Sequence, residues 1–348
     1  MEGRPVALDA QGLDSGPEVA LEAARAAAAE GIAVRLFGPA ALEAPDGVEL
    51  IAATESIRNE DEPVAAVRSR PEASIVKAAA DVADRRSGAV VSGGATGATM
   101  TAALFALRRL KGVHRPALAA QVPLPGGGTL LFLDVGANTE VRPQHLIQFA
   151  HLGAAFSGAV LGVESPRVAL LSVGEEQKKG NADVVEAHAA LAAQSEIGFI
   201  GNVEGRDLLA GAADVVVTDG FTGNVTLKTL EGTARAVAGA VRDAARSGPL
   251  AAAGGLLLRP ALGGLRESLD PNKVGGAVLL GLRGVAVVAH GSSTPEGLLN
   301  AIRLADRAVR EDAVGRTAQA LAAAGATREG LRAVEGSAED SAAPDGGG

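Results

Sequence analysis

The sequence predicts an α/β protein in which parallel strands alternate with helices. Five apolar runs of strand type each end in a loop rich in Gly, Asn and Ser: 130–138, 168–181, 197–205, 214–224 and 285–293. Short runs of Val, Ile and Leu are typical of strands buried on both faces of a parallel sheet. Ala-rich segments of helical length alternate with strand-like runs along the chain, as in α/β folds. With 348 residues and 47% hydrophobic side chains, the chain can bury a large core.

The remaining elements follow in chain order. A strand at 4–9 leads through a loop at 9–16 into a helix at 17–31, with Pro17 in its first turn. Strands at 32–38 and 48–53 come next, and a polar interval at 54–63 precedes a helix from Ser74 to Arg86. The run at 88–91 opens into the Ser92–Thr99 loop. Further helices are predicted at 142–157, 182–194 and 225–247, with a helix or helix pair at 300–325.

The stretch at 248–270 differs from a regular core helix. It is apolar and interrupted by Gly and Pro, and from Arg235 to Arg266 the chain has five arginines against one aspartate, Asp243. We expect a helical hairpin or an exposed basic lobe. Residues 1–328 contain no linker between independent halves and are interpreted as one domain, and the small and acidic residues of 329–348 predict a disordered tail.

Composition excludes several functions. A formal net charge of −9 and 2% aromatic residues argue against nucleic acid as a partner. The absence of cysteine removes a thiolate nucleophile, a thiolate metal site and disulfides, and the five histidines lack metal-ligand spacing, so no metal is expected. The N-terminus lacks a signal-peptide pattern, and no apolar run reaches the roughly 18 residues of a spanning helix. The predicted location is cytoplasmic, at most peripheral at the inner face of the membrane.

The strand-end loops are predicted to form one active-site rim. Ligands of open α/β sheets bind beyond the carboxyl ends of the strands. Glycine allows close backbone approach, and Asn and Ser offer neutral hydrogen-bonding groups. The rim therefore suits a small oxyanion.

Two loops are the main candidates for holding that anion. The amides of Ser92–Thr99 precede an apolar helix and suit phosphate, although a tight turn that needs small residues explains the loop equally. Lys179 beside Gly180 and Asn181 suits an oxyanion anchor, with a solvated Glu/Lys loop as the alternative. His290 lies two residues from Ser292, but no G-x-S-x-G motif is present, which disfavours a serine hydrolase.

Taken together, the motifs resemble one family across residues 4–325. In chain order they are DAQGLDSGP, SGGATGA, RPALAAQVP, LDVGAN, RPQHLIQFA, ESPRVALLSVGEEQKKGN, FIGNVEG, DVVVTDGFTGN, GGAVLLGLRG and AHGSS. They resemble the bacterial phosphate acyltransferase family PlsX. The resemblance implies transfer of a fatty acyl group from acyl carrier protein to inorganic phosphate, giving acyl phosphate for phospholipid synthesis. It also implies a three-layer α/β/α fold similar to isocitrate dehydrogenases and phosphotransacetylases, with two intertwined subdomains. A homodimer, no cofactor and a downstream glycerol-3-phosphate acyltransferase as a partner are further expectations.

The chain departs from the family pattern in two loops. Gln11 and Leu13 replace Met and Gly of the usual D-A-M-G-G-D, and Ala95 replaces Asn of the usual S-A-G-N-T-G-A. The loss of the Asn amide removes a hydrogen-bonding group from the candidate site. These departures bear on efficiency or substrate preference more than on the class of reaction.

Phosphate is already nucleophilic near neutral pH, so the main tasks are positioning and charge stabilisation. We expect Lys179 and the Ser92–Ala98 amides to hold phosphate. Asn181, Asn224 or His290 would donate to the developing oxyanion, and Asp219 would orient His290 or Lys179. The expected phosphate- and substrate-binding residues are Asp9, Gly12, Ser92, Gly94, Thr96, Gly97, Asn138, Gly180, Thr222, Gly223, Ser292 and Ser293.

The lobe is the expected site for the acyl chain, with Arg259 and Arg266 contacting the acidic carrier protein or an anionic membrane. The alternative is that its leucines close a dimer interface. Competing functions are a phosphotransacetylase-type enzyme that uses acyl-coenzyme A, an NAD- and metal-dependent dehydrogenase, and a catalytically weakened scaffold for phospholipid enzymes.

Overall fold

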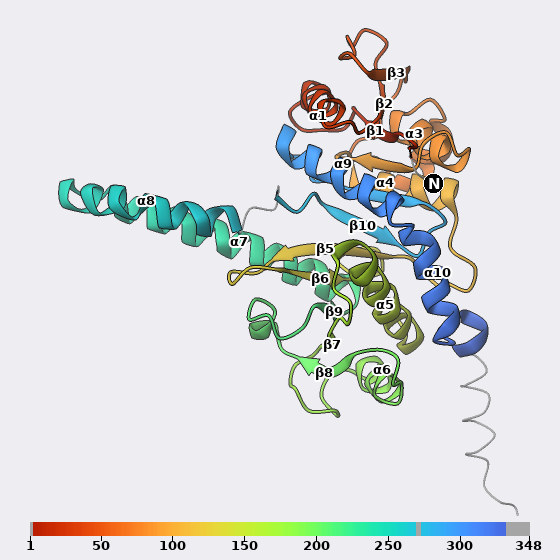
Figure 1. Ribbon diagram of the computed structural model, residues 1–348, viewed down its shortest axis with the longest axis vertical. Coiled ribbons are helices and arrows are strands. Elements are labelled where there is room, and N and C mark those ends of the chain that lie inside the picture. The colour runs from red at the N-terminus through yellow and green to blue at the C-terminus, as the bar shows by residue number, and fades with distance from the viewer. Residues whose placement is uncertain (1–2, 269–272, 332–348) are drawn as a thin grey trace, which may run out of the picture.

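The protein is built on an 11-stranded mixed sheet with helices on both faces (Figure 1). A computed structural model describes residues 3–268 and 273–331, with side chains described at 3–258 and 273–331. The strand order is β3-β2-β1-β4-β11-β10-β5-β6-β9-β7-β8. The strands are β1 Val6–Asp9, β2 Val34–Gly38, β3 Val48–Ala52, β4 Ala89–Ser92, β5 Ala117–Pro123, β6 Thr129–Leu133, β7 Val168–Leu171, β8 Phe199–Val203, β9 Val215–Val217, β10 Ala277–Leu280 and β11 Val285–Val288.

Two hydrophobic clusters cover the two faces of the sheet. The helices are α1 Glu18–Ala29, α2 Pro63–Ser69, α3 Ser74–Ala83, α4 Thr96–Leu107, α5 Pro143–Phe156, α6 Ala182–Ala192, α7 Gly220–Ala245, α8 Pro249–Ser268, α9 Pro295–Arg310 and α10 Ala313–Ala323. Val6 and Leu8 belong to the cluster that also contains residues of α1, α5, α6, α9 and α10, whereas the intervening Ala7 belongs to the cluster that contains residues of α2, α3 and α4. Because alternate residues of a strand face opposite sides, these clusters define the predicted three layers.

The sheet reverses direction in its middle, and this overturns the prediction of one rim. Strand β10 is antiparallel to both β11 and β5, and β5 is antiparallel to β6 (Figure 1). Strands β6, β9, β7 and β8 are mutually parallel and therefore point opposite to β1, β4 and β11. The loop after β11 joins the loops after β1 and β4 at one edge of the sheet. The other four loops lie at the opposite edge.

Most predicted elements form where the sequence placed them, with small differences. The 74–86 helix ends at Ala83, and the predicted C-terminal pair is α9 and α10. The short helix α2 was not predicted; it begins at Pro63, where the Glu62 side chain accepts hydrogen bonds from two backbone amides. Residues 328–331 are helical and Leu331 is buried, so the folded chain passes the predicted limit at 328. The rest of the predicted tail lies outside the described residues.

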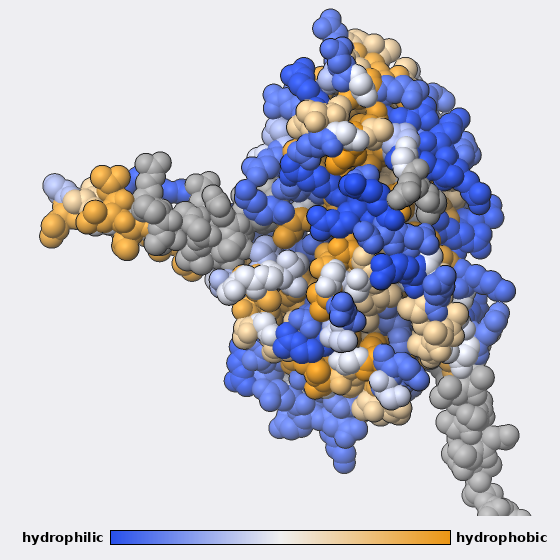
Figure 2. Space-filling view, in the orientation of Figure 1, coloured by the Kyte–Doolittle hydropathy of each residue, from blue (hydrophilic) through white to orange (hydrophobic). Residues whose placement is uncertain are grey.

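Helices α7 and α8 form an arm that projects from the body (Figure 1). A Cβ on Gly255 of α8 would lie 2.8 Å from the Cβ of Ala245, so the two helices fold back on each other after a short turn. Leu250 and Leu257 are 88% and 83% exposed, and Figure 2 shows hydrophobic residues in orange at the far end of the arm. The predicted lobe is therefore a helical arm with an apolar tip. The side chains of Arg259 and Arg266 lie outside the described part.

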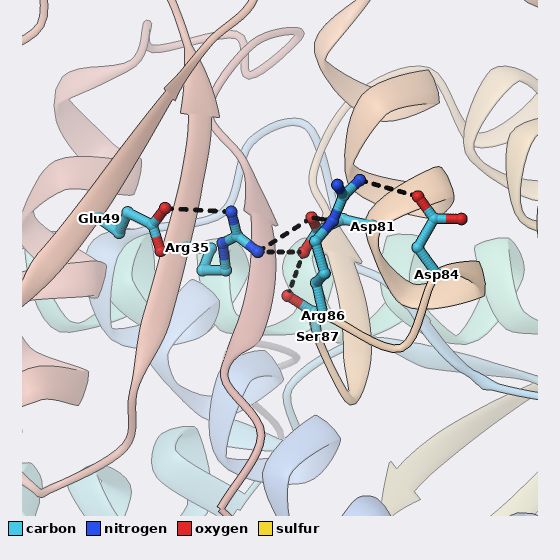
Figure 3. Close-up of polar contacts among 6 residues, drawn as sticks. All are labelled: Arg35, Glu49, Asp81, Asp84, Arg86 and Ser87. Atoms are coloured by element: carbon cyan, nitrogen blue, oxygen red, sulfur yellow. Dashed lines mark hydrogen bonds and ion pairs between the residues drawn. The ribbon is translucent and has the colours of Figure 1, made fainter.

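A cluster of ion pairs attaches α3 to the sheet. The buried carboxylate of Asp81 accepts hydrogen bonds from Arg35 of β2, at 3.1 and 3.2 Å, and from Arg86 and Ser87, at 2.8 and 2.6 Å (Figure 3). Arg35 also pairs with Glu49 of β3 at 3.1 Å. Because Asp81 is buried, removing one partner would leave an uncompensated charge. This cluster has a structural role distant from the loops described next.

Candidate functional site

Three glycine-containing loops meet in backbone contact at the edge where β1, β4 and β11 end. A Cβ on Gly12, whose φ is +87°, would lie 2.8 Å from the Cα of Gly94. A Cβ on Gly93 would lie 3.2 Å from the carbonyl oxygen of His290. The Asp14 amide donates to the Gly291 carbonyl at 2.9 Å. Glycine is required here because the backbones approach too closely for side chains. We call this the His290 edge.

A buried polar network lies beneath these loops. Ser92 Oγ donates to Asp9 Oδ2 at 2.7 Å and accepts from the Gly94 amide at 3.0 Å and from Thr99 Oγ1 at 3.2 Å. The Gln11 amide donates to Asp9 Oδ1 at 3.0 Å. Burial raises the pKa of Asp9 to about 6, against smaller opposing effects of its hydrogen bonds. Asp9 and Ser92, both expected to bind substrate, are buried and support the loops from below.

Helix α4 begins at this edge without a side-chain cap. Ala95 is its N-cap residue, and no side chain accepts a hydrogen bond from the first-turn amides. The resembling family has Asn, a preferred N-cap residue, at this position. Thr96 is exposed and Gly97 partly exposed. Their amides belong to the first turn, where an α-helix leaves its N–H groups without intrahelical partners.

Glu231 of α7 connects the other half of the sheet to the His290 edge. Its Oε1 lies 3.3 Å from His290 Nε2, and its Oε2 lies 3.0 Å from Lys228 Nζ and 4.0 Å from an Arg235 nitrogen. The hydrogen bond from His290 is the largest effect that lowers the pKa of Glu231 to about 2, and Lys228 lowers it further, against the opposing effect of burial. The carboxylate is therefore ionised throughout the neutral range.

Sequence reasoning missed Lys228 and Glu231. The signal was present: Asn224, Lys228 and Glu231 are spaced i, i+4 and i+7, so they share one face of α7. Nothing in the spacing alone indicated that this face reaches His290, because the contact joins residues 59 positions apart in the chain. Ser292 is exposed beside His290, and Ser293 is buried.

At the opposite edge, the carboxylate of Asp134 organises the loop after β6. Oδ1 accepts from the amides of Leu118, Gly136 and Ala137 at 3.0, 3.1 and 2.9 Å, and Oδ2 accepts from the amide and the side chain of Asn138, both at 2.7 Å. Asn138 Nδ2 also donates to the Pro116 carbonyl at 2.8 Å. Burial raises the pKa of Asp134.

That loop holds the start of α7. The Gly220 amide donates to the Asn138 carbonyl at 2.7 Å, and a Cβ on Gly220 would lie 2.6 Å from the same oxygen. A Cβ on Gly223 would collide with the carbonyl oxygen of Asp134. Asn138 and Gly223, both expected to bind substrate, therefore make protein contacts that position α7.

Asp219 does not orient His290, one of its two predicted partners, within one chain; orientation of Lys179, the other, stays a prediction. It is the N-cap residue of α7 and accepts hydrogen bonds from the Thr222 amide at 2.8 Å and the Thr222 hydroxyl at 2.7 Å. Its loop follows β9, whose carboxyl end is at the edge opposite His290. The reversal of the sheet separates the two residues.

Lys179 and Asn181 also lie at the opposite edge, in the loop after β7. The Lys179 carbonyl accepts from Ser172 Oγ at 2.9 Å, and Gly180 has a φ of +112°. Asn181 caps α6 by accepting from the Val184 amide at 2.9 Å. Lys179 is exposed. Within one chain, the structure does not bring Lys179 to the Ser92 loop as predicted.

The described side chains include no group of three or more His, Cys, Asp or Glu residues arranged to hold a metal ion. Among the helices of residues 3–268 and 273–331, none combines the length and apolarity needed to cross a membrane. What the His290 edge offers is a close set of backbone amides, an exposed histidine and the ammonium group of Lys228. Such groups can bind an oxyanion and stabilise developing negative charge.

Comparison with known sequences finds close relatives. A family model described as "Fatty acid synthesis protein" matches residues 5–316. The phosphate acyltransferase of Geobacillus sp. (strain WCH70) is 43% identical over 323 residues, which cover 91% of this chain and 98% of the relative. The phosphate acyltransferase of Bacillus subtilis (strain 168) is 46% identical over 267 residues, covering 77% and 80%.

Solved structures share the fold at lower identity. EutD phosphotransacetylase from Staphylococcus aureus has a TM-score of 0.57 at 18% identity and covers 88% of this chain and 94% of that one. A branched-chain phosphotransacylase from Enterococcus faecalis V583 has a TM-score of 0.57 at 20% identity, covering 88% and 99%. These similarities support the predicted phosphotransacetylase-like fold.

Proposed function

The chain belongs to the phosphate acyltransferase family, PlsX, and we propose that it transfers a fatty acyl group from acyl carrier protein to inorganic phosphate. It is an acyltransferase, as its curated relatives are. The proposed product is acyl phosphate for phospholipid synthesis, with a glycerol-3-phosphate acyltransferase as the next enzyme. The structural observation that supports this reaction most is the meeting of three glycine loops with His290.

The chemistry follows from the groups at that edge. A phosphate oxygen attacks the thioester carbonyl, the carbon–sulfur bond breaks, and the thiolate leaves. Because the chain has no cysteine, the acyl group cannot pass through an enzyme thioester, and direct transfer to phosphate is proposed. The loop amides at Gly94 and the first turn of α4 would position the phosphate.

His290 is proposed to stabilise the negative charge that develops during transfer. A carboxylate accepts hydrogen bonds but cannot donate them, so the His290 Nε2 that faces Glu231 carries the hydrogen. A donor directed at substrate must then be Nδ1–H of the imidazolium. Glu231 is accordingly proposed as the residue that positions His290, by accepting a hydrogen bond from its Nε2–H.

The proposed roles of Lys179, Asn181 and Asn224 need a further condition. Asn224 lies in the first turns of α7 close to Gly136, since a Cβ on that glycine would lie 4.0 Å from the Asn224 amide carbon. Lys179 and Asn181 belong to the loop after β7, so all three residues lie at the opposite edge. They can act on phosphate at the His290 edge only if a second copy of the chain brings them there. We therefore propose these roles for Lys179, Asn181 and Asn224 only as part of a homodimer.

The arm of α7 and α8 is proposed to contact the acyl chain or the inner face of the membrane, because its exposed leucines form an apolar tip. Contact through Arg259 and Arg266 stays a proposal from the sequence. Peripheral attachment would place a cytoplasmic enzyme near the site where its apolar product is used.

The function is tested by incubating the purified chain with phosphate and either acyl carrier protein or coenzyme A as the acyl donor. We expect acyl phosphate, with a higher kcat/KM for the carrier-protein thioester. The fold it shares with phosphotransacetylases supports coenzyme A use as the second candidate. Preference for coenzyme A would select that candidate, and no acyl phosphate from either donor would refute both.

A further inference from the structure

A basic surface lies on the side of the molecule near α10. It consists of seven exposed cationic residues: Arg108, Arg109, Lys111, Arg115, Arg142, Arg283 and Arg328. The segment from Arg108 to Arg115 contains no Asp or Glu. The acidic residues closest in sequence to these cations are Glu140, near Arg142, and Glu329, next to Arg328. On a chain with a net charge of −9, such a concentration of positive charge needs a physical explanation.

Backbone contacts join the parts of this surface, although they are distant in sequence. The Arg283 amide and Nε donate to the carbonyls of Arg108 and Arg109, both at 3.0 Å. The Arg328 amide donates to the Gly112 carbonyl at 2.7 Å. In Figure 1 the segment between α4 and β5 passes on the side of α10. The cations therefore form one continuous surface.

Arg142 is joined to the same surface through two histidines, His114 and His145. The ring centroids of His114 and His145 are 5.7 Å apart, and the Arg142 amide donates to His145 Nδ1 at 3.1 Å. Burial is the main cause that lowers the pKa of His145 to about 4, and the charges of Arg115, His114 and Arg142 lower it further. The local electrostatic environment is thus positive.

None of the seven side chains forms an ion pair within the described part of the chain. Arginines elsewhere, such as Arg70 with Asp61 and Arg167 with Asp214, pair with carboxylates at 2.7 and 2.9 Å. Here Arg109 and Arg283 donate instead to the backbone carbonyls of His114 and Arg109. The basic surface is left with unneutralised charge facing solvent.

We propose that the basic surface docks the acidic carrier protein that presents the acyl thioester. The proposal rests on the proposed function. A protein partner fits better than a membrane because membrane surfaces are bound by cations combined with exposed apolar anchors. The exposed large apolar side chain closest in sequence to the Arg108–Arg115 segment is Phe105, whose ring lies 5.3 Å from the Arg68 guanidinium carbon. The exposed leucines are instead on α8.

The position suits a donor carried on an extended arm. Arg108 follows the last residue of α4, and the Ser92 loop precedes its first. Twelve helical residues span about 18 Å, which separates the dock from the proposed phosphate site by the length of one helix. A carrier protein presents its acyl group on a prosthetic arm, so its docking surface need not touch the reacting atoms. Complementary charge would raise the rate of encounter and would make it depend on salt.

The test compares two charge-reversed double variants. Lys111→Glu with Arg115→Glu changes the basic surface, and Arg25→Glu with Arg307→Glu makes the same charge change at exposed, unpaired residues of α1 and α9. With phosphate held constant, we expect the KM for the carrier-protein thioester to rise about tenfold or more in the first variant. We expect kcat, and kinetics with an acyl-coenzyme A donor, to stay within about twofold. The α1 and α9 variant should resemble wild type for both donors.

Two results would overturn the proposal: an unchanged carrier-protein KM, or an equal rise in KM for both donors. If an unchanged carrier-protein KM were accompanied by lost binding to phosphatidylglycerol vesicles, the surface would be assigned to membrane. Titration calorimetry with acyl-loaded carrier protein measures docking without catalysis. If wild type made no acyl phosphate but still bound the carrier protein through this surface, the proposed function would fail and the docking surface would stand.

Discussion

His290 and Glu231 come from oppositely directed halves of the sheet and meet at 3.3 Å, between Nε2 and Oε1. Helix α7 makes this contact possible because it begins beside Asn138 at one edge and reaches the other edge within its first turns. Glu231 also pairs with Lys228, so one largely buried carboxylate joins the imidazole of His290 to the ammonium group of Lys228. The contact links the part of the chain that follows β9 to the glycine loops that follow β1, β4 and β11.

The first prediction concerns this contact. Glu231→Gln should lower kcat about tenfold or more because His290 loses the charged acceptor that orients its ring. The substitution leaves unchanged the other charged groups near His290, which are Asp14 on the facing loop and Lys228 and Arg235 on α7. A difference in kcat between wild type and variant is therefore attributed to the carboxylate of Glu231.

A double-mutant cycle separates positioning from a general structural effect. In a His290→Ala background, Glu231→Gln should cause little further loss, because the two residues act as one unit. Glu22→Gln, at an exposed glutamate of α1, is the matched control and should behave as wild type. Fully additive losses would show that Glu231 acts independently of His290.

The second prediction concerns the buried carboxylate under the Ser92 loop. The pKa of Asp9 is about 6 in the folded state, against a reference value of 3.8. Between these two pH values the folded state therefore retains a proton that the unfolded chain has lost. The free energy of unfolding should therefore fall as pH rises from about 4 to about 6, by about 3 kcal/mol from this group. In Asp9→Asn that component should vanish. Denaturant titrations at several pH values measure it, and equal slopes in both proteins would contradict the prediction.

The third prediction concerns the uncapped start of α4. Ala95→Asn should raise the free energy of unfolding by about 1 kcal/mol, because an Asn side chain can accept a first-turn amide. Ala95→Val adds bulk without an acceptor and should not stabilise. Chemical denaturation of the three proteins decides the point. A stability gain in the valine variant would attribute the effect to packing.

The fourth prediction concerns the cluster of Figure 3. Asp81→Ala should destabilise the fold by about 3 kcal/mol or more, because it leaves the largely buried Arg35 without its main partner. Asp84→Ala removes an exposed partner of Arg86 and should cost less than about 1 kcal/mol. Thermal and denaturant unfolding measure both. Equal losses in the two variants would show that burial does not decide the contribution.

The fifth prediction distinguishes capping from catalysis at Asp219. Asp219→Ala should lower stability by about 1 kcal/mol through loss of the α7 N-cap, with kcat within about threefold of wild type. Asp219→Ser preserves an N-cap acceptor and should recover most of that stability. A large loss of kcat in the serine variant, at normal stability, would restore a catalytic role.

Much of the fold could be predicted because it depends on local patterns. The apolar runs, the Ala-rich helices and the Gly-rich loops identify strands, helices and turns from neighbouring residues alone. Helix α2 was missed because it is seven residues long and follows a polar interval. Glu231 was missed because its partner, His290, is brought close only by the fold.

The sequence by itself determined the α/β class, the family and the loops in which the candidate residues lie, since each follows from local composition and motif order. Only the tertiary structure decided which loops share an edge. Two strands, β10 and β5, reverse the sheet, and their antiparallel pairing depends on backbone hydrogen bonds between distant segments that no local pattern specifies. That reversal places His290 with Asp9 and Ser92, moves Lys179 and Asp219 to the other edge, and leaves α7 as the element that connects them.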